Sequence, residues 1–359
     1  MKLFTLGPVE MYERTKTIGA LQNPYFRVPE FSIFMQETDM LLREFMNAPS
    51  DYHVVYLASS GTGAMEATLM NCFDASDKLL VINGGQFATY FTRLCDYQNL
   101  SYDCVEIPFG NTLTANDLFP FANKGYTALL VNIHETSTCQ LYDIKVLKEF
   151  CIQNNMYLVV DAISSVCADE YDIQKYEIDV TIISSQKGFA LSPGLAMVIM
   201  SPKIFEEKVK KHKILSLYFD FKEYVKNMTR YQTPYTPAIG ILYQLNDMLK
   251  FLLKDGENNS AGYSKLLAEH FRKGVDRLAV SMPSYPLSNA ATPFFFPNNA
   301  FSVHRILKDR YDILINPSAI LPDVLCRVGH FGNLTLKDHD VLLIILEQVL
   351  EELRNDNHK

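Results

Sequence analysis

Residues 181–200 read TIISSQKGFALSPGLAMVIM, and the fold class can be worked out from this stretch outward. Two runs rich in β-branched and apolar residues, at 181–184 and 195–200, flank a short hinge of small and polar residues. Short, almost wholly apolar runs of this kind predict strands that are buried on both faces of a sheet. One lysine, Lys187, lies in the hinge. A lysine between two buried strands must either reach solvent or serve a purpose inside the protein.

Similar apolar runs recur from residue 53 onward and predict a sheet of seven strands. They are HVVYLA (53–58), KLLVIN (78–83), YDCVEI (102–107), TALLVN (127–132), MYLVVD (156–161), DVTIIS (179–184) and LAMVIM (195–200). Helix-like segments separate most of them, at 64–72, 87–97, 115–122 and 144–153. Strands that alternate with helices predict βαβ units, and hence an α/β fold with a mostly parallel sheet covered by helices.

The chain of 359 residues is too long for one core, because single cores stop growing at roughly 250–300 residues. After residue 200, helices are predicted over 201–212 and 238–254, and DGENNS at 255–260 is the best linker candidate. We therefore expect an N-terminal arm and large domain over 1–255 and a smaller α+β domain over 256–359. The final helix is predicted to start at Thr335, with Asp338 in a capping-box position.

The composition excludes several classes of protein. A formal net charge of −8 argues against binding to nucleic acid or to an anionic membrane surface. Seven cysteines without a CxxC pair argue against a disulfide framework and a structural zinc site, so no metal is predicted. The N-terminus lacks a secretory signal, and the late apolar run VLLIIL is far shorter than the roughly 20 residues of a membrane span. We expect a cytoplasmic protein.

Small, polar or reactive residues follow five of the predicted strands, in the segments SSGTGAME, GGQF, HETST, DAISS and SSQKG. Ligands of open α/β sheets bind outside the carboxyl ends of the strands, so these segments predict one site. In SSGTGAME the glycines and the helix start favour an anion such as phosphate. The segment is neither a Walker loop nor a good dinucleotide fingerprint, and an ordinary strand–helix turn remains an alternative.

Asp161 and Lys187 are the candidate reactive pair. Asp161 ends an apolar strand, where it serves either as a helix N-cap or as the counter-ion of a protonated ring nitrogen. The small and apolar neighbours of Lys187 offer little rescue by solvent, and a desolvated lysine has a lowered pKa and forms Schiff bases. A lysine, an aspartate and a phosphate cup are together the requirements of pyridoxal 5′-phosphate.

On these motifs the sequence resembles the class V aminotransferases of the fold type I pyridoxal-phosphate enzymes. It is most similar to the 2-aminoethylphosphonate–pyruvate and alanine–glyoxylate aminotransferases. The resemblance runs in order through LGPVEM, FRVPEF, SSGTGAMEA, INGGQF, HETST, VVDAISS, SSQKGF, QTPYTP and CRVGHFG, which covers nearly the whole chain. It implies a homodimer with shared active sites.

The resemblance also implies roles for individual residues. Lys187 and Asp161 are the catalytic pair: the lysine forms the imine link to the cofactor and moves the proton, and the aspartate holds the pyridine nitrogen. Phe87 stacks on the ring and Thr136 lies near its hydroxyl oxygen. The phosphate contacts are Ser60, Gly61, Thr62 and Gln186, joined by Thr233 and Thr236 from the neighbouring subunit. Substrate binding falls to Arg327, which grips a carboxylate, and to Gly7. For an arbitrary arginine a surface salt bridge is the alternative.

Two positions depart from the family pattern, and a third has two alternative roles. Cys139 follows HETST where the family commonly has glycine, and Tyr90 replaces an arginine that often follows the stacking aromatic residue. Both weaken any transfer of substrate identity. Arg27 in FRVPEF either binds a second acidic group or braces the N-terminal arm, and bracing is the favoured interpretation.

The expected function is transfer of an amino group from a small donor, of the alanine, serine or 2-aminoethylphosphonate type, to a small 2-oxo acid of the pyruvate or glyoxylate type. A cysteine desulfurase or lyase on the same scaffold is an alternative. Desulfurases use a cysteine on a mobile loop and usually a histidine before the lysine, whereas this chain has Gln186 there and Cys326 in a strand-like run. A non-catalytic cofactor-binding protein is the other alternative.

Overall fold

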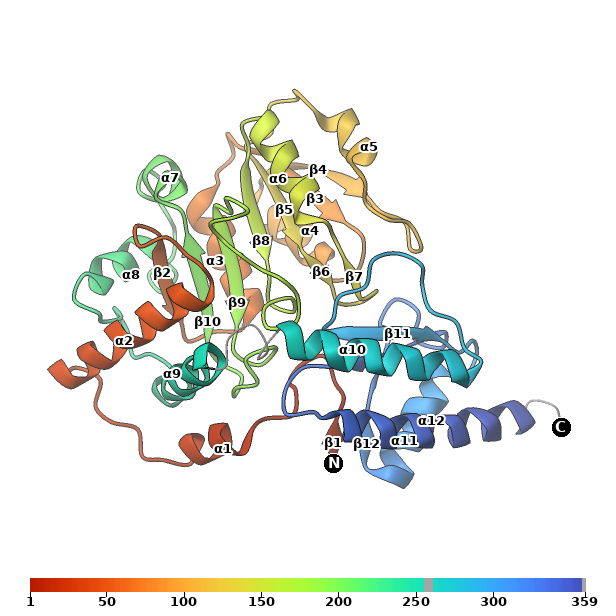
Figure 1. The fold of residues 1–359 in the computed structure, drawn as a ribbon. Coiled ribbons are helices and arrows are strands. Elements are labelled where there is room, and N and C mark those ends of the chain that lie inside the picture. Colours follow the sequence, from red (N-terminus) through yellow and green to blue (C-terminus); the bar gives the residue numbers. More distant parts are fainter. Residues whose placement is uncertain (255–260, 357–359) are drawn as a thin grey trace.

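The computed structural model describes residues 1–254 and 261–356. Its centre is a sheet of seven strands in the order β2-β10-β9-β8-β5-β3-β4 (Figure 1). The strands are β2 (His53–Leu57), β3 (Lys78–Asn83), β4 (Ser101–Glu106), β5 (Ala128–Asn132), β8 (Tyr157–Asp161), β9 (Val180–Ser184) and β10 (Ala196–Met200). Only β10 runs antiparallel to its neighbours in this sheet, so the predicted mostly parallel seven-stranded sheet is confirmed.

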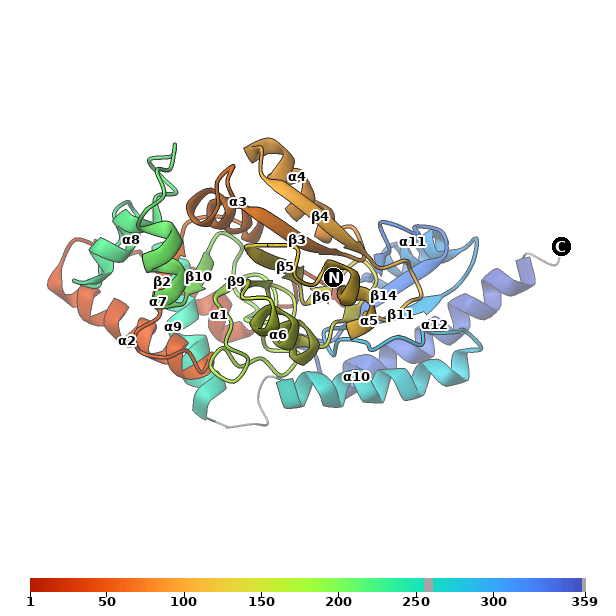
Figure 2. The same cartoon turned by 90° about the horizontal axis from the view of Figure 1, so that it is seen from above.

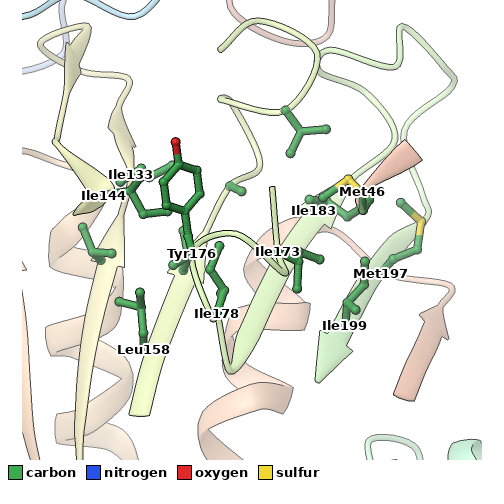
Figure 3. Packing of buried hydrophobic residues seen from close by; sticks show 14 of the residues in the cluster. Met46, Ile133, Ile144, Leu158, Ile173, Tyr176, Ile178, Ile183, Met197 and Ile199 are labelled. Atoms are coloured by element: carbon green, nitrogen blue, oxygen red, sulfur yellow. The ribbon is translucent and has the colours of Figure 1, made fainter. Parts of the chain in front are cut away.

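Helices cover both faces of this sheet, as Figure 2 shows from above. One face packs on α2 (Pro29–Phe45), α6 (Ile144–Gln153) and α9 (Ile239–Lys254). The other face packs on α3 (Gly61–Cys72), α4 (Ala88–Gln98), α7 (Pro202–Ile204) and α8 (Phe221–Met228). Successive strand residues point to opposite faces, so apolar residues at every position fill both cores. Figure 3 shows part of the first core, where Ile183, Met197 and Ile199 of the sheet lie near Met46 and Ile173.

Most predicted helices agree with the structure, and two are shorter or irregular. The prediction over 115–122 becomes α5 (Ala115–Leu118) followed by a 3₁₀ turn over Phe119–Phe121, where Pro120 removes a backbone donor. The prediction over 201–212 becomes α7 followed by a π-helical turn over Phe205–Val209. A short helix, α1 (Glu13–Gly19), lies in the N-terminal arm.

The C-terminal part builds a second, smaller layer of helices and strands beside the large sheet (Figure 1). Its helices are α10 (Ala261–Val275), α11 (Ala300–Tyr311) and α12 (Leu336–Asp356). They pack on the three-stranded sheet of β11 (Ala291–Phe295), β14 (Leu325–Gly329) and β13 (Asn316–Pro317). Thr335 and Asp338 exchange backbone and side-chain hydrogen bonds at the start of α12, so the predicted capping box is present.

The chain's first residues belong structurally to this smaller part. Strand β1 (Lys2–Leu3) pairs in parallel with β12 (Ile313–Leu314), and Phe4 is buried in the C-terminal core. The N-terminal arm therefore crosses from one part to the other, which the division at 255/256 does not express. That boundary, with the linker prediction at 255–260, stays a prediction because it lies outside the described residues. None of the described helices is long and apolar enough to cross a membrane.

Candidate active site

The five strand-end segments meet at one cavity of about 110 Å³ at the carboxyl edge of the sheet. Each segment supplies at least one of its lining residues, which are Ser60, Gly61, Thr62, Met65, Phe87, Tyr90, Asn132, His134, Thr136, Asp161, Ile163, Ser164, Gln186 and Lys187. A larger hollow of about 540 Å³ lies at the opposite edge, where β8 and β9 begin. We place the site in the smaller cavity because ligands of parallel sheets bind at the carboxyl ends of the strands.

Lys187 is held in the cavity by the N-terminal arm. Its amine donates a 2.5 Å hydrogen bond to the carbonyl of Leu6. Gly7 packs directly on it, since a Cβ atom at Gly7 would lie 2.4 Å from Cδ of Lys187, and Gly7 has φ of +127°. Burial lowers the pKa of Lys187 to about 8, although the negative charge of Asp161 opposes the shift. At pH 7 about a tenth of the amine is therefore unprotonated, far more than for an exposed lysine.

Asp161 is 8% exposed and lies at the end of β8. One carboxylate oxygen accepts a 2.9 Å bond from the N–H of Ile163, and the other accepts a short bond from the amide of Asn132. Burial raises the pKa of Asp161 to about 6, while these bonds and the charge of Lys187 pull it down. A positive group placed against this carboxylate would be stabilised strongly, because little water screens it.

The aromatic wall of the cavity is Phe87, with Tyr90 beside it. The Phe87 ring centre lies 5.8 Å from the amine nitrogen of Lys187 and 5.8 Å from the Tyr90 ring. Tyr90 lines the cavity itself, so this departure from the family pattern does change the pocket wall.

At the anion end, Ser60, Gly61 and Thr62 begin α3. The side chain of Ser60 caps the helix by accepting a 3.2 Å bond from the N–H of Gly63. The free backbone N–H groups of the first helical turn and the positive end of the helix dipole favour a phosphate here. Gln186 lines the same cavity next to Lys187.

Three polar cavity residues were missed by the sequence analysis: Asn132, His134 and Ser164. The hydroxyl of Ser164 shares a 2.6 Å hydrogen bond with that of Thr136, and its carbonyl accepts a 2.9 Å bond from Nδ1 of His134. Burial lowers the pKa of His134 to about 3, so the ring is neutral and its Nε2 is an acceptor. Nε2 of His134 and Oδ1 of Asn132 are buried without a hydrogen-bond partner. Their position in strand-end segments was the available signal.

Arg327 lies on β14 beside the cavity and is 7% exposed. Its guanidinium donates to the carbonyls of Thr136, at 2.6 Å, and Pro317, at 2.8 Å, and its Nε is buried without a partner. Burial lowers the pKa of Arg327, and its positive charge helps to lower the pKa of Lys187. A surface salt bridge is therefore the wrong interpretation for this arginine, because it is buried and bonded to backbone.

Thr233 and Thr236 do not line the cavity of their own chain. The hydroxyl of Thr233 bonds to the carbonyl of Tyr235 at 2.6 Å. Arg27 donates to the carbonyls of Thr233 and Pro234, both at 2.7 Å, which is the bracing arrangement favoured from the sequence.

The backbone explains why glycine is usual at position 139. Cys139 has φ of +63°, in the left-handed region that glycine adopts without steric cost. Its thiol is fully buried and lies 3.9 Å from the carbonyl of Thr136. The departure therefore alters packing behind the cavity wall, and Cys139 does not line the cavity.

Comparison with known proteins identifies the family of this chain. The family model "Aminotransferase class-V" matches residues 23–300. The "Soluble hydrogenase 42 kDa subunit" of Anabaena cylindrica is 30% identical, over 99% of this chain and 95% of its own. Serine–glyoxylate aminotransferase of Arabidopsis thaliana is 27% identical, over 92% of this chain and 85% of its own.

Among solved structures, an aspartate aminotransferase of subgroup IV from Thermus thermophilus superimposes with a TM-score of 0.90. It is 24% identical, and the match covers 98% of this chain and 99% of that one. At this identity the likeness shows the fold, which is that of the fold type I aminotransferases. Because the family model covers well over half of the sequence, the chain belongs to the class V aminotransferases.

Proposed function

We propose that this aminotransferase uses pyridoxal 5′-phosphate to move an amino group from a small donor to a small 2-oxo acid. The donor is of the alanine, serine or 2-aminoethylphosphonate type, and the acceptor is of the pyruvate or glyoxylate type. The observation that carries the proposal is the cavity in which a desolvated amine, Lys187, and a buried carboxylate, Asp161, lie with an aromatic wall and a helix N-terminus.

The residues present fit this cofactor. Ser60, Gly61, Thr62 and Gln186 would hold its phosphate, Phe87 would stack on its ring and Thr136 would reach its hydroxyl oxygen. Asp161 would keep the ring nitrogen protonated, which offsets the burial that raises the pKa of this carboxyl to about 6. When bound, the cofactor supplies an electron sink for the charge left after proton removal. The buried, unpartnered acceptors of Asn132 and His134 indicate that this wall is completed by a ligand.

The protein's own groups perform the proton transfers. Lys187, with its pKa near 8, would be the general base that takes the proton from the α-carbon of the amino donor and carries it for the later return. General acid–base catalysis of this kind contributes typically about 10²–10⁴-fold. Arg327 binds the substrate carboxylate through two parallel hydrogen bonds and orients the α-carbon toward Lys187. Gly7 leaves room for this movement, because it has no side chain against Lys187.

The active unit is a homodimer in the cytoplasm. Thr233 and Thr236 lie on a segment that Arg27 braces and that does not reach the cavity of its own chain. Their proposed contact with phosphate is therefore made in the neighbouring subunit. All seven cysteines are unpaired, in agreement with a reducing compartment.

The choice of substrates follows the names of relatives. The similar proteins include an L-aspartate–glyoxylate aminotransferase from Paracoccus denitrificans and the plant serine–glyoxylate aminotransferase. Glyoxylate recurs in these names, and one arginine at the cavity suits a 2-oxo acid with a single carboxylate. We therefore place glyoxylate and pyruvate first among the acceptors.

The desulfurase or lyase alternative is less well supported. Cys326 is fully buried in β14, where burial raises the pKa of its thiol to about 12. A nucleophilic cysteine needs a thiolate that can reach the substrate, and Cys326 has neither property. The non-catalytic alternative leaves the lowered pKa of Lys187 without a purpose.

A panel of amino donors tests the proposal. Purified protein with pyridoxal phosphate is given alanine, serine, aspartate, 2-aminoethylphosphonate or cysteine, and loss of the cofactor's absorbance band is followed with and without glyoxylate. We expect a donor to shift the band and glyoxylate to restore it. Lys187→Ala should bind cofactor but form no imine, and should lose about 10²–10⁴-fold in turnover. Sulfide released from cysteine without any 2-oxo acid, or full turnover by Lys187→Ala, would refute the proposal.

A further inference from the structure

Helix α4 begins without a capping side chain of its own, because Phe87 occupies its N-cap position. The backbone N–H groups at a helix start need acceptors from elsewhere. In α4 the acceptors for these N–H groups are side chains about 50 residues further along the chain. The N–H of Gln86 donates to Oγ of Ser137 at 3.0 Å, and the N–H groups of Phe87 and Ala88 donate to the carboxylate of Glu135 at 3.3 and 3.0 Å.

Glu135 is fully buried, with 0% of its surface exposed. A buried carboxylate is costly unless its oxygens are satisfied. Besides the two helix N–H groups, it accepts bonds from the N–H of Ser137 at 3.0 Å and from the Ser137 hydroxyl at 2.5 Å. The positive end of the α4 dipole favours the negative charge as well. Glu135 is thus a fully bonded cap supplied by another loop.

The loops that carry Gly85 and Glu135 pack so closely that residue 85 has no room for a side chain. A Cβ atom at Gly85 would lie 2.4 Å from Oγ of Ser137 and 2.6 Å from Cδ of Glu135. Glycine is therefore required at position 85 so that the backbone can approach the carboxylate. The segments GGQF and HETST form one rigid unit at this contact.

This unit carries two of the proposed cofactor contacts. The N–H of Phe87 is bonded to Glu135, and the ring of Phe87 is the aromatic wall that faces Lys187. Thr136 follows Glu135 directly, and its carbonyl accepts the 2.6 Å bond from Arg327. The carboxylate of Glu135 is therefore bonded directly to the backbone that carries the stacking ring.

We infer that Glu135 is a positioning residue that fixes the ring of Phe87 for stacking on the cofactor. The inference rests on the proposed function, since it assigns Glu135 a role through Phe87 in cofactor binding. The rival explanation is a helix cap that stabilises the fold and has no specific effect on the cofactor. The two explanations differ in whether the effect of Glu135 depends on the aromatic ring at position 87.

A double-mutant cycle with Glu135→Gln and Phe87→Leu separates them. Glutamine keeps the shape of the side chain but replaces one acceptor oxygen by an NH₂ group that faces a donor. We expect Glu135→Gln to weaken binding of pyridoxal phosphate about tenfold in the otherwise wild-type protein. In the Phe87→Leu protein the same change should weaken binding less than about twofold, because the ring that it positions is gone.

Hydrogen exchange in the cofactor-free protein gives a readout independent of activity. Glu135→Gln should speed exchange of the amides at 86–88 and leave the amides of β8 unchanged. Asp169→Asn is the matched control, since Asp169 is another buried carboxylate, 4% exposed, that does not line the cavity and accepts bonds from Ser165, Ser288 and Asn289. It should lower the melting temperature while cofactor affinity stays within about twofold.

Each of the following outcomes would overturn the positioning role of Glu135, and the last would overturn the proposed function as well. Equal losses of affinity from Glu135→Gln with and without Phe87 would overturn the positioning role and leave the proposed function intact. Unchanged exchange at 86–88 would overturn it as well. Failure of the wild-type protein to bind pyridoxal phosphate would overturn the proposed function and this inference with it.

Discussion

Two groups of buried polar side chains differ in one respect: whether their hydrogen bonds are complete. The first group surrounds the cavity, where Asn132, His134 and Arg327 each have a buried atom without a partner. The second lies in the C-terminal part between α10, β11 and α12, and we call it the histidine chain, defined as Arg272, Thr292, His330, His339 and Thr335. In the histidine chain no buried side-chain atom of the described residues lacks a partner.

The direction of every bond in the histidine chain is fixed. Nδ1 of His339 faces the carbonyl of Thr335 at 2.9 Å, so it must carry the hydrogen and leave Nε2 as an acceptor. Nδ1 of His330 therefore donates to it at 2.9 Å, and Nε2 of His330 accepts from Thr292 at 2.7 Å. The Thr292 hydroxyl in turn accepts from Arg272 at 3.1 Å. With both histidines neutral, each of these bonds has one donor and one acceptor.

The completeness of their hydrogen bonds distinguishes a buried ligand site from a buried polar group that stabilises the fold. Both groups have polar atoms shielded from water, and both contain an arginine and a neutral histidine. Unsatisfied buried atoms are rare in folded proteins because each costs about 1–3 kcal/mol. Where they gather beside a cavity they indicate that a ligand completes them. Where every atom is paired, the group serves the fold.

The largest expected effect contrasts the two arginines. Arg327→Lys keeps the charge but loses the planar pair of donors, so kcat/KM for the 2-oxo acid should fall about 10²-fold. Arg272→Lys should lower the melting temperature and leave the KM of the 2-oxo acid within about twofold, because Arg272 bonds only to Thr292 and backbone carbonyls. Steady-state kinetics on both variants check this. Equal changes in the KM of the 2-oxo acid for the two variants would contradict this distinction between the two arginines.

A second prediction concerns the sign of stability changes in the cofactor-free protein. Lys187→Met removes a desolvated amine and should raise the free energy of unfolding at neutral pH by roughly 1–3 kcal/mol. Thr292→Val leaves Nε of Arg272 and Nε2 of His330 without their partner, while Arg272 keeps its bonds to backbone carbonyls, and it should lower the free energy of unfolding by about 1–3 kcal/mol. Urea unfolding measures both. If both variants are destabilised, the desolvated amine of Lys187 does not lower the stability of the cofactor-free protein.

The pH dependence of the free energy of unfolding should reflect the lowered pKa values of the two histidines in the histidine chain. Burial lowers the pKa of both histidines, that of His330 well below its usual value, with the charge of Arg272 adding to the effect. Below about pH 6.5 the unfolded chain binds protons that the folded chain does not, so stability falls as pH falls. Each histidine contributes a slope of up to about 1.4 kcal/mol per pH unit.

His339→Gln should reduce this slope by the share of one histidine. Asp161 and Asp169 have raised pKa values and act in the opposite direction, so the difference between wild type and variant is the quantity to measure. Unfolding free energies between about pH 4.5 and 6.5 provide it. Parallel curves for the two proteins would show that His339 takes up its proton equally in the folded and unfolded states.

The smallest expected effect concerns Cys139, which lies behind the cavity wall. Cys139→Gly and Cys139→Ala both remove the buried thiol, but only glycine adopts φ of +63° without steric cost. Cys139→Gly should therefore be more stable than Cys139→Ala by about 1 kcal/mol. Thermal unfolding compares them directly. Equal stability would mean that the left-handed backbone at this position carries no strain.

Local pattern was enough for much of the fold and of the site. The seven apolar runs formed the seven strands because burial on both faces demands apolar residues at every position. Lys187 and Asp161 could be selected because each polar residue ends or interrupts such a run. The shortened helices at 115–122 and 201–212 show the limit, since propensity does not fix where a helix ends.

The sequence by itself determined the α/β class, the order of strands and helices, and the five segments that meet at the cavity, because these follow from periodicity within short windows. Tertiary structure alone decided which buried atoms lack partners, that Glu135 caps a helix in another segment, and that β1 joins the C-terminal strands. These features depend on contacts between residues far apart in the chain. Their geometry exists only once the chain has closed, so no local pattern records it.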